Sequence, residues 1–161
     1  MSERVLGVDP GTAVTGYGVI QPSPDGRHRL VECGVIRTPV RGSLGQRLLA
    51  IHDGLTELID RHQPTTLAVE SVFFARNVRT TVVLGHARGV VLLAGAAAHL
   101  EIVEFPPATV KKAIVGAGGA TKAQVAYMVQ QLLRLKTPPT PADAADGVAI
   151  ALTHLLTRSP V

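Results

Sequence analysis

Cysteine and aromatic residues are scarce in this chain. It has one cysteine, Cys33, no tryptophan, three phenylalanines and two tyrosines among 161 residues. A single cysteine excludes an intrachain disulfide, and the N-terminal segment 1–4 is charged and has no apolar signal run, so we expect a reducing, cytoplasmic location. Because aromatic residues make up only 3% of the chain, the core has to be built from valine, leucine, isoleucine and alanine.

Long hydrophobic runs, zinc-ligand spacings and phosphate-binding loops are also missing. The longest apolar run, 82–98, is interrupted by His86 and Arg88 and is short for a membrane span, so we expect no membrane helix. The six histidines show no ligand spacing, which argues against a zinc site. The glycine-rich stretch 116–122 fits neither GxxxxGK[ST] nor GxGxxG, and we interpret it as a hinge before a helix.

What remains is the composition of a mildly basic globular protein. Hydrophobic residues make up 46% of the chain and charged residues 17%, which excludes a disordered chain. The length suits a single domain over residues 1–161. The net charge of +4 and the isoelectric point near 9.7 favour a polyanionic partner, although many proteins without one are equally basic.

The segment 5–12 combines a strand with a carboxylate. Val5, Leu6 and Val8 suit a buried strand, and the Pro-Gly pair that follows Asp9 ends it. Asp9 therefore lies at the tip of a core strand. On this segment alone the favoured interpretation is an Asx turn, in which the side chain bonds the turn's own backbone. The alternative is a carboxylate displayed for chemistry.

Strands over 14–21 and 30–37 follow after short turns, which is typical of an antiparallel meander. Two more strands are predicted over 66–70 and 101–105, and they alternate with helices. The expected fold class is therefore α/β. Its five-stranded mixed sheet has three antiparallel strands followed by parallel strands, with helices on its faces.

Apolar residues recurring every three or four positions predict the helices. The first such run starts at Leu44 and is closed by Pro64. Thr121 is expected to cap one later helix, and Thr140 to cap the final one with Pro141 as its first residue. The other predicted helices cover 82–99 and 108–114.

Four carboxylates stand beside apolar core segments. Asp9 and Glu70 each end a strand, and parallel neighbours would bring both to one sheet edge, where open α/β folds place their sites. Asp143 and Asp146 are three residues apart and share one face in the first turn of the final helix. Each acid alone has an ordinary explanation, as a solvated strand end or as helix-start chemistry.

Taken together, four converging carboxylates would repel one another, and a divalent cation would relieve that repulsion. Oxygen ligands favour Mg²⁺ or Mn²⁺ over zinc. Two such ions roughly 3.5–4 Å apart can activate water and stabilise the leaving oxygen in phosphodiester hydrolysis. The acids therefore favour metal-dependent nuclease chemistry.

Five short motifs occur in an order and spacing that together are specific. They are Gly7-Val8-Asp9-Pro10-Gly11, Thr15-Gly16-Tyr17-Gly18-Val19-Ile20, Val69-Glu70-Ser71-Val72-Phe73, Gly85-His86-Ala87-Arg88-Gly89-Val90 and Asp143-Ala144-Ala145-Asp146. Over nearly the whole chain this pattern resembles the RuvC family of bacterial Holliday junction resolvases, within the RNase H-like superfamily. The resemblance implies that Asp9, Glu70, Asp143 and Asp146 are catalytic acids that bind Mg²⁺, with Mn²⁺ as a substitute and two ions per site.

The resemblance also implies a substrate and partners. Members of this family are homodimers that bind four-way DNA junctions and make paired, symmetric nicks in recombination and repair. Their usual partners are RuvA and RuvB, the branch-migration proteins. The chemistry implied is attack of water on a phosphodiester without a covalent intermediate. No membrane partner is implied.

Five residues are candidate DNA contacts. By the resemblance, Phe73 stacks on junction bases, and Lys111 and Lys122 approach the DNA. Arg76 and Arg79, in the loop after Phe73, could hold phosphates near the scissile bond. The alternatives are a core phenylalanine and ordinary solvated charges. The small-residue helix 82–99 is a candidate dimer contact, or else it simply packs on the sheet.

Three other functions stay open. One is an actin-like or sugar-kinase ATPase lobe, although such enzymes need two lobes and a second phosphate loop. Another is a non-catalytic junction-binding module, against which the presence of all four acids argues. The third is a nuclease of RNA–DNA hybrids, and here the loop with Phe73 and Arg76 favours the junction.

Overall fold

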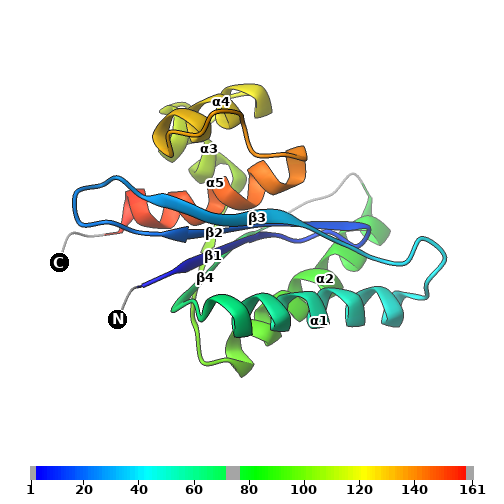
Figure 1. Cartoon of the computed structure of the whole chain (residues 1–161). Helices are drawn as coiled ribbons and strands as arrows, with labels where there is room; N and C mark the ends of the chain where they lie inside the picture. The colour runs from blue at the N-terminus through cyan, green and yellow to red at the C-terminus, as the bar shows by residue number, and fades with distance from the viewer. Residues whose placement is uncertain (1–2, 72–76, 159–161) are drawn as a thin grey trace.

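Figure 1 shows a computed structural model, which describes residues 3–71 and 77–158. A five-stranded sheet lies between two helical layers, with α3, α4 and α5 on one face and α1 and α2 on the other (Figure 1). The predicted α/β fold with a mixed sheet is therefore confirmed.

The sheet has the strand order β3-β2-β1-β4-β5. The first three strands in the chain form an antiparallel meander, whereas β1 pairs with β4 and β4 with β5 in parallel. This is the arrangement that the sequence predicts. The strands are β1 (Val5–Asp9), β2 (Val14–Gln21), β3 (Arg29–Arg37), β4 (Thr66–Glu70) and β5 (Glu101–Phe105).

Side-chain caps fix the starts of three helices. Ser43 and Thr121 each form a capping box with a glutamine three residues later, so the predicted cap at Thr121 is confirmed. Asn77 accepts from the backbone N–H of Thr80 (2.8 Å), which is why α2 begins before residue 82. The helices are α1 (Leu44–His62), α2 (Val78–Ala97), α3 (Pro107–Val115), α4 (Lys122–Leu132) and α5 (Ala142–Thr157).

The start of α5 differs from the prediction. Pro141 itself occupies the N-cap, and its carbonyl accepts from the backbone N–H groups of Ala144 and Ala145 (2.9 and 3.3 Å). No side chain caps this helix, so the prediction of Thr140 as the cap is wrong. Because α5 starts one residue later than expected, Asp143 lies in its first turn and Asp146 in the next.

The helix α5 is the centre of one of two apolar cores. Val5 and Ile20 of the sheet pack against α5, α3 and α4 on one face, while Leu6, Val8 and Leu55 belong to the core beneath α1 and α2. Eleven of the sixteen residues of α5 are buried, so it is apolar almost all round and not only on one face. This burial fixes the helix that bears two of the four acids.

The helix α2 has an exposed apolar side. Val91 and Ala94 are buried, whereas Val78, Val82 and Leu93 are exposed. By length and composition α2 could cross a membrane, with 22% of its apolar window buried. One such helix is weak evidence, because core helices meet the same criterion, and the expected absence of a membrane span stays a prediction.

Candidate active site

Three elements bring the four predicted acids to one edge of the sheet. The parallel register, which pairs Val8 with Val69, places Asp9 and Glu70 side by side at the carboxyl ends of β1 and β4. The start of α5 supplies the other two acids. Carboxylate oxygens of Asp9, Asp143 and Asp146 lie within 4.8 Å of one another, so the predicted convergence is present.

Close contact between α5 and the sheet makes this geometry possible. A Cβ on Gly16, the strand partner of Asp9, would overlap the carbonyl oxygen of Asp143. A Cβ on Gly147 would lie 2.5 Å from the Cα of Tyr17. Only glycine allows backbones to approach this closely. Neither glycine was predicted to have a role, and their position inside strand and helix patterns was the available signal.

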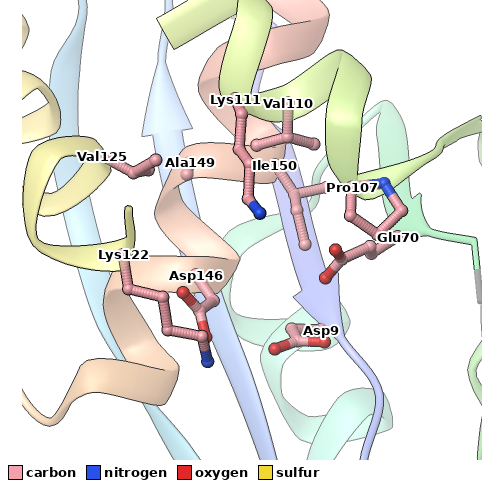
Figure 2. Close-up of a pocket in the computed structure, with 10 residues that line it drawn as sticks. All are labelled: Asp9, Glu70, Pro107, Val110, Lys111, Lys122, Val125, Asp146, Ala149 and Ile150. Carbon is pink, nitrogen blue, oxygen red and sulfur yellow. The ribbon is translucent and has the colours of Figure 1, made fainter. Parts of the chain in front are cut away.

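The turn after Asp9 is held by Thr15. Its hydroxyl donates to the carbonyl of Gly11 (2.8 Å), and its oxygen accepts from the N–H of Gly11 (3.2 Å). Among residues 3–71 and 77–158, no backbone N–H of this turn bonds the carboxylate of Asp9. The Asx-turn interpretation is therefore wrong, and the carboxylate faces the cavity (Figure 2).

A cavity of about 160 Å³ lies at this edge of the sheet. Carboxylates and lysines stand on one part of its wall and apolar side chains on the rest (Figure 2). Because the acids are partly buried in this wall, charges in the cavity interact more strongly than in bulk water. The lining residues are Asp9, Glu70, Pro107, Val110, Lys111, Lys122, Val125, Asp146, Ala149 and Ile150.

Burial dominates the electrostatics of the acids. It raises the pKa of Asp9 to about 8, and the negative charges of Glu70 and Asp146 add to the rise. Burial also raises the pKa values of Glu70 and Asp146. The ionised form of these groups is thus destabilised, and a bound cation would compensate for the lost hydration.

Two lysines face the acids from the α3–α4 layer. The ammonium of Lys122 lies 3.4 Å from the carboxylate of Asp146, and this pairing raises the pKa of Lys122. Lys111 reaches into the same cavity from α3 (Figure 2). Both lysines among the predicted DNA contacts therefore line the cavity beside the acids, whereas their neighbour Lys112 does not.

The donor set fits a hard divalent cation. Asp9, Asp143 and Asp146 offer only carboxylate oxygens, which suit Mg²⁺ and Mn²⁺. Glu70 lines the same cavity and interacts electrostatically with Asp9. The acidic cluster could hold a metal, with Asp9 at its centre.

The remaining candidate contacts have different positions. Arg79 lies outside the acidic cavity and lines a second cavity on the α1–α2 side, together with Arg47. Arg47 was not identified from the sequence, where it looks like any exposed helix charge. Phe73 and Arg76 lie outside the described residues.

Comparison with known proteins decides the family. A profile of the family described as crossover junction endodeoxyribonuclease RuvC matches residues 5–154. The chain belongs to the RuvC family. A RuvC of Halorhodospira halophila is 51% identical over 157 residues, which is 97% of this chain and 92% of that protein.

Solved RuvC structures share the fold over almost the whole length. Thermus thermophilus RuvC superposes with a TM-score of 0.87 at 37% identity, over 95% of this chain and 93% of that one. The same protein in complex with a Holliday junction substrate gives a TM-score of 0.86 at 34% identity, with the same coverage. The chain is thus a RuvC-family enzyme with the family's nuclease fold.

Proposed function

We propose that this chain resolves four-way DNA junctions by paired, symmetric nicks, through metal-dependent hydrolysis of phosphodiesters. The convergence of Asp9, Glu70, Asp143 and Asp146 at one sheet edge is the observation that supports it most. Two observations support a four-way junction as the substrate. The chain belongs to the RuvC family, and it resembles a relative solved with a Holliday junction substrate.

The four acids would hold the metal, which we propose to be two Mg²⁺ ions replaceable by Mn²⁺. When bound, the ions supply an activated water and stabilise charge on the phosphate. The protein's own residues would orient the phosphodiester and exclude water from the site. The ammonium groups of Lys111 and Lys122 face the acids, where they would bind non-bridging oxygens of the phosphodiester.

Symmetric nicks require two active sites, so the functional unit is proposed to be a homodimer. The exposed apolar residues of α2, Val78, Val82 and Leu93, form a surface that a second copy would cover. Residues 1–161 would make up one domain, act in the cytoplasm and cooperate with RuvA and RuvB. Phe73, Arg76 and Arg79 are further proposed contacts with the junction.

A nicking assay with several substrates tests the proposal. A labelled four-way junction, a plain duplex and an RNA–DNA hybrid are each incubated with the protein and Mg²⁺, Mn²⁺ or EDTA. Symmetric cuts in the junction alone, absent in EDTA, are expected. Preferential cutting of the hybrid would instead assign the site to a ribonuclease, and ATP-dependent activity would favour the ATPase alternative.

A further inference from the structure

A second cavity lies on the other face of the active-site edge of the sheet. Its volume is about 350 Å³, and it is formed by the turn after β1 and by the starts of α1 and α2. Thr12 in its wall is only three residues beyond Asp9, so one turn separates the two cavities. The lining residues are Thr12, Gly42, Leu44, Arg47, Arg79 and Val83.

The wall of this cavity is positively charged and contains no acid. Its two charged residues are Arg47 and Arg79, and neither α1 nor α2 has an acidic residue in its first turn. Arg41 is the chain neighbour of Gly42 in the wall. Arg37 precedes Thr38, whose hydroxyl donates to the carbonyl of Thr12 (2.6 Å). Arg37 and Arg41 are both exposed, so two further positive charges lie close in sequence to residues of this region.

The two arginines of the wall are held differently. The guanidinium of Arg47 donates to the carbonyls of Val40 (2.8 Å) and Gly42 (3.4 Å), which anchors it to the loop before α1. Arg79 is exposed, and it has no hydrogen bond or ion pair within the parts of the chain that the structure describes. The cavity therefore combines one fixed guanidinium with one that is available for an anion.

We propose that this cavity binds a backbone phosphate of the DNA substrate other than the phosphate that is cut. The inference rests on the proposed function and adds a second contact on the α1–α2 side of the sheet edge. Guanidinium groups suit this role because they can bind phosphate oxygens in a bidentate manner. A phosphate there would meet two arginines and no carboxylate, whereas a phosphate at the active site lies against four acids.

The substitution Arg79→Gln tests the contact. Junction binding is measured in EDTA, so that no cutting occurs, over a range of salt concentrations. Loss of one phosphate contact should make the negative slope of log K against log salt shallower by about one. We expect affinity at low salt to fall about 3- to 10-fold, while Arg79→Lys, which keeps the charge, restores most of it.

Arg29→Gln is the matched control. Arg29 is exposed at the far end of β3, and its removal changes the net charge by the same amount. If Arg79→Gln and Arg29→Gln give the same salt slope, the proposal is overturned. The effect would then come from the loss of one positive charge anywhere on the protein and not from a specific phosphate contact. Wild-type protein that fails to prefer the junction would instead refute the proposed function itself.

A second arm separates DNA phosphate from free phosphate. Calorimetric titration with inorganic phosphate is expected to show no binding at millimolar concentrations, because the cavity is open and would bind a phosphate held in place by the rest of the DNA. Saturable binding that Arg79→Gln abolishes, with junction affinity unchanged, would assign the cavity to a free anion and overturn the proposal.

Discussion

Asp9 is the residue whose environment is most unusual. It ends β1 in a half-buried position, and its pKa is raised to about 8 by burial and by the charges of Glu70 and Asp146. A carboxyl at a position so poorly hydrated can serve as a metal ligand at neutral pH only if something else stabilises its ionised form. This is the physical reason to expect a cation at the centre of the four acids.

Without metal, the stability of the protein should fall as pH rises from about 4 to about 8. In this window Asp9 is already ionised in the unfolded chain but keeps its proton in the folded protein, so the unfolded state binds fewer protons. In thermal unfolding measured in EDTA, Tm should fall as pH rises, by roughly 2–4 °C for each kcal/mol of lost stability. Asp9→Asn should flatten the profile, and an equal slope in both proteins would contradict this assignment.

Lys122 should compete with the metal for Asp146. Its ammonium lies 3.4 Å from that carboxylate but its side chain is 80% exposed, so the pair contributes only up to about 1 kcal/mol. Lys122→Met should therefore raise the affinity for Mn²⁺ about two- to fivefold, as measured by calorimetry. Lys111→Met is the control, since Lys111 lines the same cavity without an ion pair to Asp146. Unchanged or weaker Mn²⁺ binding by Lys122→Met would show that the pair does not compete.

At the scale of elements, the seating of α5 on the sheet determines where half of the site lies. Gly16 and Gly147 allow this contact, because a Cβ at either position would run into backbone atoms. The backbone of a buried helix and a central strand cannot move apart without disturbing the core on both sides. The site and the core are thus coupled through this contact.

Gly147→Ala should destabilise the protein and weaken metal binding together. The added methyl group would meet the backbone of Tyr17 at 2.5 Å, and such overpacking costs about 1–3 kcal/mol. Denaturant unfolding and Mn²⁺ titration would measure the two effects. Gly119→Ala, where an added Cβ meets nothing within 4 Å, should change neither. A stable Gly147→Ala protein with normal Mn²⁺ affinity would contradict the importance of this contact.

Most element boundaries could be predicted from the sequence, because the apolar periodicities are clear. Strands over 14–21, 66–70 and 101–105 occur as expected. The start of α5 could not be predicted, since Pro141 serves as an N-cap through its carbonyl alone. The local pattern of Thr140 and Pro141 resembled a cap followed by a first-turn proline, and only the backbone geometry distinguishes the two.

At the scale of the whole molecule, the exposed side of α2 should mediate self-association. Leu93 on α2 and Leu49 on α1 are both 59% exposed, so a substitution at Leu49 is a matched control for one at Leu93. Sedimentation should give a particle of twice the 16.9 kDa chain mass. Leu93→Asp should shift it to the monomer, while Leu49→Asp should leave it unchanged. A dimer that survives Leu93→Asp but not Leu49→Asp would place the contact on α1.

The site itself was partly predictable. The pairing of Asp9 and Glu70 followed from two apolar strands that end in acids and lie in parallel. Asp143 and Asp146 were recognised mainly through the family resemblance, because acids at a helix start are common. The second cavity could not be predicted, since Arg47 and Arg79 are distant in sequence and meet only where α1 and α2 begin at the same edge of the sheet.

The most direct test of the central claim is to measure cutting and binding of a four-way junction by Asp9→Asn, beside Glu70→Gln and the wild-type protein. Loss of an acid should reduce Mg²⁺-dependent cutting at least about a hundredfold, since several kcal/mol of transition-state stabilisation depend on the metal. Junction binding should persist, because removing negative charge does not weaken attraction to phosphate. If either variant cuts the junction at the wild-type rate, the four-acid site is not the catalytic centre.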